Sequence, residues 1–148
     1  MSVLKSRRND SKAEYVNLAY NIYIDVLQFL TRLSARYGRL VSSDTIQLAG
    51  EVLDNCEKTN SIYPSDELRV QLREQHLVEA RAALMALDVR MAIAHDLMRK
   101  NPQGCFENLT APDAMKRLDK MSQKLGEKID KENGYLTNLL KSDKKRIK

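Results

Sequence analysis

The sequence of 148 residues contains few of the residues that interrupt helices, with only three prolines and five glycines. Tryptophan is absent and aromatic residues make up 5% of the chain, whereas 43% of the residues are hydrophobic. These shortages argue against a sheet-rich fold, because sheets need tight turns and favour aromatic and β-branched side chains. The composition predicts a helical protein, and the length suffices for one domain with one hydrophobic core.

Cysteines and long apolar stretches are also scarce. Cys56 and Cys105 match neither a disulfide framework nor a zinc motif, so we expect two reduced thiols, with a bond between them as the alternative. No apolar run is long enough to cross a bilayer, and the basic first residues lack the apolar middle of a secretion signal. These absences predict a cytoplasmic protein.

The net charge of +5 is concentrated at the two ends of the chain. Residues 1–12 carry a net charge of +3 and residues 141–148 a net charge of +4, which leaves −2 on the 128 residues between them. We expect both ends to be basic, disordered tails around a folded region of residues 13–140. Such tails either neutralise the phosphates of a nucleic acid or keep a protein soluble, and the sequence favours neither.

The most apolar segment runs from Tyr15 to Leu30, where only four of sixteen residues are polar. These four fall on one narrow line of a helix, so the helix has almost no face for water. Because a surface helix normally exposes about half of its circumference, we expect other helices or other copies of the chain to cover the excess apolar surface. The expected oligomer interface consists of Tyr20, Ile22, Ile24 and Leu27.

Apolar residues spaced alternately three and four apart predict four helices. The first extends from about Ser11 to Tyr37 and stops at Gly38. The other three begin after polar clusters at residues 42–44, 65–67 and 110–113, whose side chains can cap a helix N-terminus. The second helix ends near Asn60 and the third before 101–104.

The third and fourth helices have clear apolar seams. The seam of the fourth helix includes the polar residues Ser122 and Glu132, and glycines 126 and 134 lower its helix propensity by roughly 1 kcal/mol each. Four seams of matching period, joined by short links, predict an all-α, antiparallel up-down four-helix bundle. The seam expected for the third helix is Leu77, Ala80, Leu84, Leu87, Met91, Ala94 and Met98.

Motifs for catalysis and for cofactors are missing. A di-iron bundle needs Glu-x-x-His twice, but His76 and His95 follow Arg73 and Ala92 at that spacing. The sequence also contains no Gly-rich phosphate loop. Two carboxylate pairs resemble the magnesium ligands of all-α nucleotide pyrophosphohydrolases, but nearby lysines explain both pairs as surface charge. We therefore predict a protein without catalytic residues, metal or cofactor; the pairs are Glu51 with Asp54 and Glu127 with Asp130.

Arginines form the best candidate for a binding surface. Three of them are spaced four and three apart near the end of the first helix, and two more mark the start of the third. Arginine grips phosphate with two parallel hydrogen bonds, although pairing with Asp66 and Glu74 is the alternative. Together with the C-terminal tail, the expected nucleic-acid-binding residues are Arg32, Arg36, Arg39, Arg69, Arg73, Lys144, Lys145 and Arg146.

The order of these segments resembles a known family. A Tyr- and Leu-rich helix at 15–23 precedes a short helix, a Pro-containing loop, a long Arg/Ala/Leu helix through 68–87 and a Lys-rich closing helix. Over residues 13–140 the layout is similar to the bacterial four-helix-bundle proteins that include the accessory variability determinant of diversity-generating retroelements and the 23S ribosomal RNA intervening-sequence proteins. The resemblance implies a pentameric ring with a basic surface that binds nucleic acid and docks a reverse transcriptase.

Three functions are compatible with the sequence. The first is a non-catalytic, homo-oligomeric protein that binds RNA or DNA and serves as an accessory to a reverse transcriptase. The second is a protein-protein interaction scaffold, in which the basic segments meet an acidic partner. The third is a magnesium-dependent nucleotide hydrolase that uses the carboxylate pairs.

Overall fold

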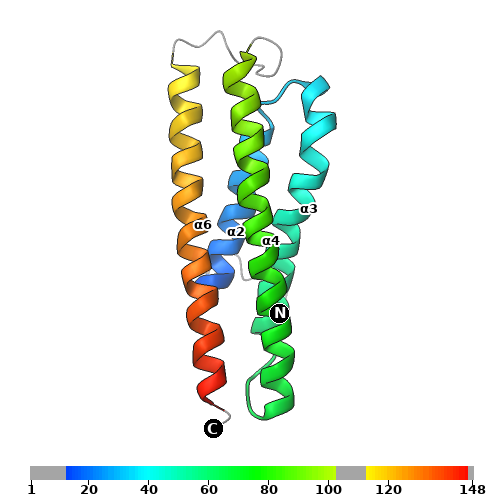
Figure 1. Cartoon of the computed structure of the whole chain (residues 1–148), viewed down its shortest axis with the longest axis vertical. Helices are drawn as coiled ribbons and strands as arrows, with labels where there is room; N and C mark the ends of the chain where they lie inside the picture. The colour runs from blue at the N-terminus through cyan, green and yellow to red at the C-terminus, as the bar shows by residue number, and fades with distance from the viewer. Residues whose placement is uncertain (1–12, 103–112, 147–148) are drawn as a thin grey trace, which may run out of the picture.

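The computed structural model describes residues 13–102 and 113–146, which form four long α-helices and no strands (Figure 1). The all-α class and the number of helices are confirmed. Within the described part of the chain, no helix combines the length and apolar content needed to cross a membrane. The N-terminal segment 1–12 and Cys105 lie outside the described residues. The helices are α2 (Glu14–Leu30), α3 (Ala35–Asn60), α4 (Glu67–Lys100) and α6 (Ala114–Lys145).

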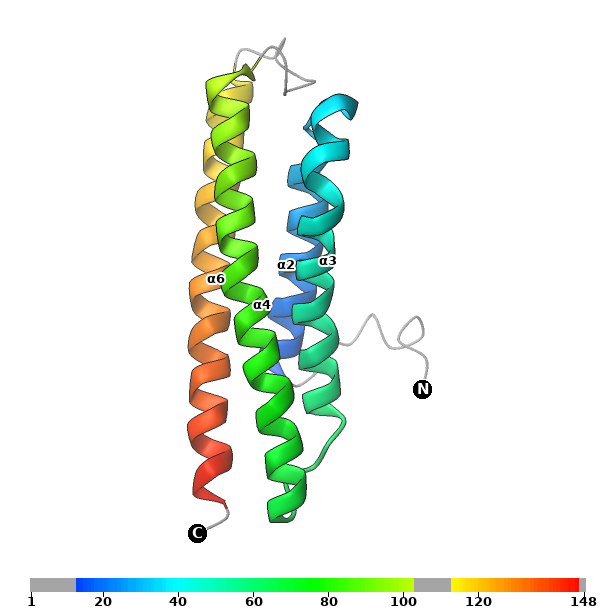
Figure 2. The same cartoon turned by 45° about the vertical axis from the view of Figure 1, so that its right-hand side comes forward.

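Each helix packs against two neighbours, because α2 and α4 both lie against α3 and α6. The result is a long bundle around one core (Figures 1 and 2). Contacts fix the relative placement of the two longest helices. Arg73 near the start of α4 binds Asp143 near the end of α6, whereas His95 near the end of α4 binds Asp119 near the start of α6.

The core follows the apolar seams expected from the sequence. All seven seam residues of α4 are buried, and the seam of α6 contributes Leu118, Leu125, Ile129 and Leu136. From the first two helices the core receives Val16, Ala19, Val26, Ala49 and Cys56, among others. The three–four spacing therefore identified the buried face of α4 and most of that of α6, because that spacing returns to one side of an α-helix.

The boundary between the first two helices differs from the prediction. The first helix ends at Leu30, and α3 begins at Ala35, so Gly38 lies inside α3 and does not stop a helix. The Gln28 carbonyl, in the last turn of α2, accepts hydrogen bonds from the Thr31 hydroxyl and the Arg32 guanidinium. These side chains replace the backbone donor that a further helical turn would supply. Glycine ends a helix through a left-handed conformation, and no described glycine adopts one.

The short α2 is largely covered by its own chain. Ile22, predicted for an oligomer interface, is 1% exposed and belongs to the core, so that assignment is wrong. Ile24 and Leu27 are partly exposed, and Tyr20 is half exposed. The excess apolar surface expected from this helix is small because α3 and α6 pack along both of its sides.

A buried ion pair joins three segments at the lower end of the bundle. Arg73 Nε donates to Asp143 Oδ2 over 2.7 Å, and Nη1 donates to the carbonyls of Thr59 and Ile62 over 2.8 and 2.7 Å. The two carbonyls lie at the end of α3 and in the turn that follows it. Arg73 is 7% exposed and Asp143 is 2% exposed. This network holds the ends of α3 and α6 to the start of α4.

The same network explains why the last helix is longer than expected. We predicted that residues 141–148 would be a disordered tail, but α6 continues to Lys145. Asp143 lies on the buried face of the helix, where its pairing with Arg73 fixes the final turn. The prediction failed because charge counting treated Asp143 as one more solvated group.

Glu132 is buried inside the bundle. Its side chain is fully buried, and neither carboxylate oxygen has a hydrogen-bond partner among residues 13–102 and 113–146. Burial raises the pKa of Glu132 from 4.5 to about 8. Burial is also the main cause of the raised pKa of the Cys56 thiol, to which the charges of Glu132 and Glu57 add. Cys56 is therefore protonated and unreactive at neutral pH.

Replacing Gly134 by alanine should stabilise α6. An added Cβ at Gly134 meets no atom within 4 Å, so the substitution costs no clash. Alanine favours a helix over glycine by about 1 kcal/mol, and the free energy of unfolding should rise by about that amount. Urea denaturation followed by circular dichroism measures the change, and an unchanged or lower stability would contradict it.

Candidate nucleic-acid interface

A row of exposed lysines runs along the outward face of α6. Their spacings are mostly four or seven residues, which return to nearly the same side of a helix. The opposite side of α6 is buried in the core. At about 1.5 Å per residue, the row is about 44 Å long. We call it the lysine row, and its members are Lys116, Lys120, Lys124, Lys131, Lys141 and Lys145.

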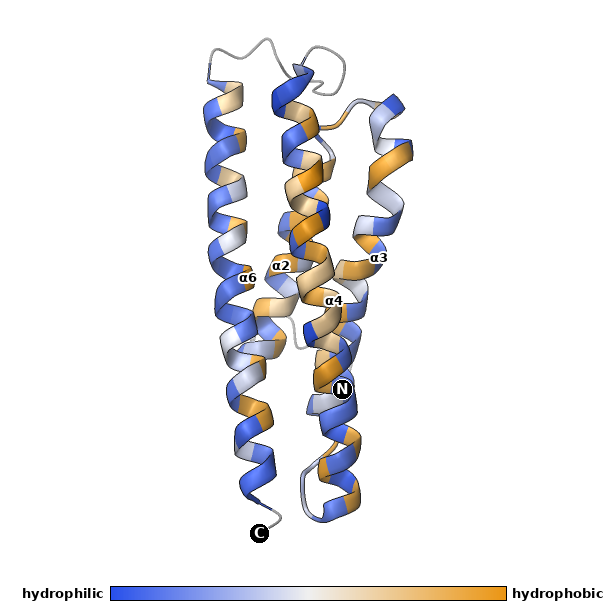
Figure 3. Ribbon diagram, viewed as in Figure 1, coloured by the Kyte–Doolittle hydropathy of each residue, from blue (hydrophilic) through white to orange (hydrophobic). Residues whose placement is uncertain are grey.

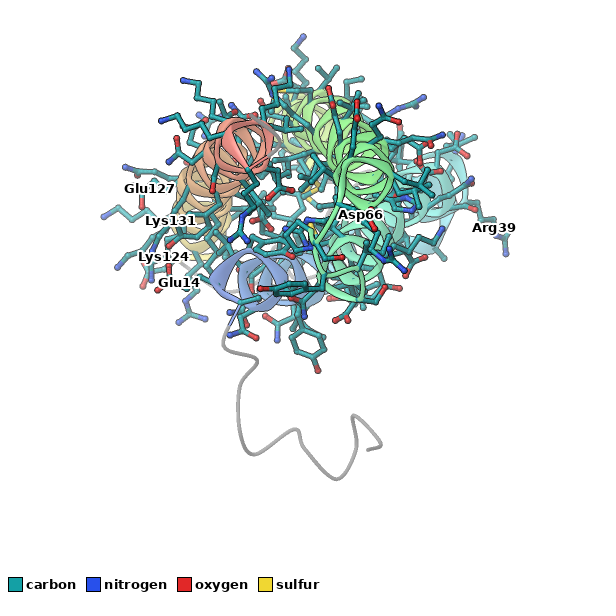
Figure 4. The ribbon with its side chains drawn as sticks, turned by 90° about the horizontal axis from the view of Figure 1, so that it is seen from below. Glu14, Arg39, Asp66, Lys124, Glu127 and Lys131 are labelled. Carbon is teal, nitrogen blue, oxygen red and sulfur yellow. The ribbon has the colours of Figure 1, made fainter. Side chains whose placement is uncertain are left out.

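The lysine row carries more positive than negative charge. One exposed acid, Glu127, lies on the same side of α6 as Lys124 and Lys131 (Figure 4). No member forms a salt bridge within residues 13–102 and 113–146, whereas Lys128 pairs with Asp25. Helix α6 contains nine basic and five acidic residues, and two of the acids, Glu132 and Asp143, are buried. Helices α2 and α3 together contain three basic and six acidic residues. One side of the bundle is therefore basic.

A shallow groove between α2 and α6 borders the lysine row. It consists of two hollows of about 420 and 220 Å³ that share Glu14 and Tyr135. The ammonium group of Lys131 lies 5.7 Å from the centre of the Tyr135 ring. Aromatic rings beside lysines are typical of surfaces on which nucleic-acid bases stack. Figure 4 shows that Glu14 lies on the same side of the bundle as Lys124 and Lys131, so the groove also contains one acid.

The first predicted arginine cluster is not on one helix. Arg32 lies in the turn after α2, where its guanidinium binds the Gln28 carbonyl, while Arg36 and Arg39 lie in the first turns of α3. Both α3 arginines are exposed. Figure 4 shows Arg39 on the opposite side of the bundle from Lys124 and Lys131. The cluster is therefore separate from the lysine row.

The two arginine clusters also lie at opposite ends of the molecule. The start of α3 is at the upper end in Figure 1, and the start of α4 is at the lower end. Arg69 is exposed and pairs with Asp66, whose side chain also accepts from the Arg69 backbone at the start of α4. Arg73 is buried in the network described above, so its assignment to a phosphate-binding surface is wrong.

Of the three C-terminal basic residues predicted for the site, only Lys145 belongs to the lysine row. Lys144 lies 3.6 Å from Glu74 of α4, Lys145 ends α6, and Arg146 is the residue that follows. All three are exposed. Lys144 and Lys145 belong to the last turn of α6, whereas the sequence predicts that residues 141–148 form a disordered tail.

Nothing in the described residues forms a metal centre. No group of three or more His, Cys, Asp and Glu side chains within residues 13–102 and 113–146 could hold a metal ion. The carboxylate pairs of α3 and α6 are exposed on separate helices. His95 instead hydrogen-bonds Asp119 over 2.8 Å, and hydrogen bonds from Arg99 and then His95 lower the pKa of Asp119. These contacts link α4 to α6.

The lysine row contains residues that sequence reasoning did not select. Lys116, Lys120, Lys124 and Lys131 were visible as part of a charged helix, but Asp119, Glu127 and Asp130 were expected to neutralise them. In the structure, Asp119 turns to His95 and Arg99 of α4. Spacing gave the signal, because the lysines share one line of the helix, and of the three acids only Glu127 lies on that line.

Comparisons with known proteins give no identification. No family model, curated protein or solved structure matches this chain.

Proposed function

We propose that this chain is a non-catalytic, homo-oligomeric nucleic-acid-binding protein, built as an antiparallel up-down four-helix bundle. The observation that carries the proposal is the lysine row, in which six exposed lysines that form no salt bridge in the described chain lie along one side of α6 with one acid, Glu127, among them. A nucleic-acid backbone offers a matching line of phosphates. Binding then releases condensed counterions, which supplies most of the sequence-independent affinity.

The physical signature of such binding is its dependence on salt. Each neutralised phosphate contributes a slope of about −0.9 for duplex DNA, or about −0.7 for a single strand, in a plot of log affinity against log salt concentration. If four to six lysines of the row each meet a phosphate, the affinity falls steeply between 50 and 200 mM salt. The side of the bundle formed by α2 and α3 is acidic and does not compete for the phosphates.

Neutralising the first half of the lysine row should weaken binding strongly. In the triple variant Lys116→Gln, Lys120→Gln, Lys124→Gln, we expect the salt slope to shrink by roughly three phosphate contacts and the affinity at low salt to fall at least about tenfold. Fluorescence anisotropy with labelled single-stranded and duplex RNA and DNA measures both quantities. Each oligonucleotide is titrated over a series of salt concentrations.

The matched control replaces Arg32, Arg36 and Arg39 by glutamine. It removes the same net charge from residues outside the lysine row, of which Arg39 lies on the opposite side of the bundle (Figure 4), so only a local effect of the lysine row distinguishes the two triple variants. We expect the control to bind nearly as well as the unchanged protein. Equal losses in the two variants, or no binding of any oligonucleotide at low salt, would refute the proposal.

A partner reverse transcriptase is the further element that the resemblance adds to this proposal. A pull-down with the full chain as bait tests it, with and without nuclease treatment. Capture of a reverse transcriptase would support an accessory role. If acidic proteins are captured equally well after nuclease treatment and the anisotropy assay shows no binding, the chain is a protein-interaction scaffold and the nucleic-acid proposal is wrong.

A further inference from the structure

Helix α4 is apolar on the side that faces away from the core. Nine large hydrophobic residues are exposed in the described chain, and six of them belong to α4. In Figure 3 hydrophobic colours cover much of the upper half of α4, while α6 is mostly hydrophilic. Exposed apolar area of this kind is typical of interaction surfaces. The six residues are Leu68, Leu72, Val78, Met85, Val89 and Ile93.

Part of this surface forms a regular stripe. Val78, Ala82, Met85, Val89 and Ile93 are spaced four, three, four and four residues apart, which follows one line of a helix. Their exposed fractions include 60% for Val89 and 52% for Val78. The buried seam of α4 occupies the other side of the helix, so α4 has two apolar faces. A helix with two apolar faces needs a second packing partner.

Charged residues border the stripe in a self-complementary pattern. Glu79 and Arg90 lie along one edge of the stripe, and Arg81 and Asp88 lie along the other. Each pair is centred on the same point, between residues 84 and 85. Glu79 and Arg90 form no ion pair with the rest of the described chain, and Arg81 donates a hydrogen bond only to Asn133.

We infer that the outward face of α4 is the contact between two copies of this chain, packed antiparallel about a two-fold axis near Met85. A two-fold axis at this point brings Glu79 opposite Arg90 of the second copy, and Arg81 opposite its Asp88. Each edge of the interface then contains two ion pairs, each between a carboxylate of one copy and a guanidinium group of the other. The inference rests on the homo-oligomeric part of the proposed function and names its surface.

The charge pattern fits the antiparallel arrangement more closely than the parallel one. In a parallel pair the two different edges of the stripe face each other, so Glu79 would lie two residues out of level with Arg81 of the second copy. Arg90 would likewise lie two residues out of level with Asp88. In the antiparallel pair the opposite charges on both edges lie at the same level. The small residues Ala82 and Ala86 flank Met85 and let the two helices approach closely. A two-fold contact also closes after two copies.

The dimer face and the lysine row lie on different helices. The lysine row occupies α6, and the apolar stripe occupies α4. Both faces are therefore free to be occupied at the same time, and a dimer presents two lysine rows to one nucleic acid. Tight binding to long nucleic acids by two linked rows is then an avidity effect.

Sedimentation velocity with the full chain, without nucleic acid, tests the interface over a range of protein concentrations. We expect a concentration-dependent equilibrium between one and two copies. In the Met85→Glu variant, two carboxylates lie near the two-fold axis, and the dissociation constant should rise about 100-fold. Leu40→Glu is the matched control, because Leu40 is 74% exposed on α3 and should leave the equilibrium unchanged.

A charge-reversal cycle tests the orientation. The single variants Glu79→Arg and Arg90→Glu each create like-charge pairs and should weaken the dimer about tenfold. The double variant Glu79→Arg with Arg90→Glu restores opposite charges at both places and should regain the original dissociation constant. Thermal unfolding of each variant verifies that the exposed substitutions leave the bundle folded.

The outcomes separate this inference from the proposed function. If the unchanged chain assembles but Met85→Glu has no effect, the α4 interface is wrong while a homo-oligomer remains. An assembly of five copies would likewise overturn the two-fold contact in favour of the ring. A chain that is monomeric at all concentrations overturns both the interface and the homo-oligomer, whereas nucleic-acid binding is judged separately by the lysine-row variants.

Discussion

Replacing Arg73 by methionine is expected to lower the free energy of unfolding by about 3–5 kcal/mol. The substitution keeps most of the side-chain volume but leaves Asp143, which is 2% exposed, as a buried carboxylate without its cation. It also removes the donor that the Thr59 and Ile62 carbonyls share. Urea denaturation measures the loss, and because it is a large part of a typical domain stability, the variant should unfold well below the unchanged chain.

Two further variants keep this prediction open to refutation. Arg73→Met combined with Asp143→Leu removes both charges and should regain part of the lost stability, although the two carbonyls stay without a donor. Arg99→Met breaks the exposed contact with Asp119 and should cost much less. If Arg73→Met and Arg99→Met prove equally harmless, the buried network does not hold the lower end of the bundle.

Replacing Glu132 by glutamine is expected to stabilise the protein increasingly as the pH rises. The unfolded carboxyl has a pKa of 4.5 and the folded one a pKa of about 8, so between these values the folded state binds the proton more tightly. The unchanged chain therefore loses stability as the pH rises through this window. The loss is complete above about pH 8 and is on the order of 4 kcal/mol, which the glutamine variant does not suffer.

The difference in unfolding free energy between variant and unchanged chain isolates this effect. Measured at pH 5 and pH 8.5, the difference should move in favour of Glu132→Gln by several kcal/mol, since the contributions of other titrating groups cancel. Glu127→Gln is the control, because Glu127 is an exposed carboxylate on the same helix. A difference that stays constant with pH would show that Glu132 is ionised and paired in the folded protein.

The two buried polar features have opposite consequences for the molecule. The Arg73–Asp143 pair has its hydrogen bonds satisfied and fixes which helix ends meet. Glu132 is a polar group in the core whose oxygens have no partner in the part of the chain that the structure describes, so it lowers stability at any pH at which it is ionised. Both lie on the inner side of the bundle, away from the lysine row and the α4 stripe. Substitutions at these buried positions should change the stability of the bundle more than its binding to nucleic acid or to a second copy.

Sequence periodicity predicted the core well and the surfaces poorly. All seven seam residues of α4 were predicted correctly, because the burial of a helix face follows from the local spacing of apolar residues in the sequence. Arg73 was assigned to a phosphate-binding surface, although it lies at a buried position. Its partner Asp143 is 70 residues away, and no local pattern connects the two.

The excess apolar surface illustrates the same limit. The sequence predicts that residues 15–30 carry the excess apolar surface. In the structure α2 is covered on two sides, and Tyr20 is its only large hydrophobic residue that is exposed. The outer face of α4 carries most of them, although its seam looked like that of an ordinary amphipathic helix. Which apolar helix remains uncovered depends on how the four helices pack, and that is a property of the whole bundle.

By itself, the sequence determined that this chain is helical, has four helices and buries their three–four seams, because helix propensity and apolar spacing are local properties. Only the tertiary structure decided which charged side chains remain unpaired on the surface and which apolar helix face remains exposed to solvent. Asp143 and Glu132 are buried in the core and Asp119 pairs with α4, so Glu127 and Asp130 are the exposed acids of α6 that remain beside its lysines. Partners of this kind come from distant parts of the chain and are set by packing.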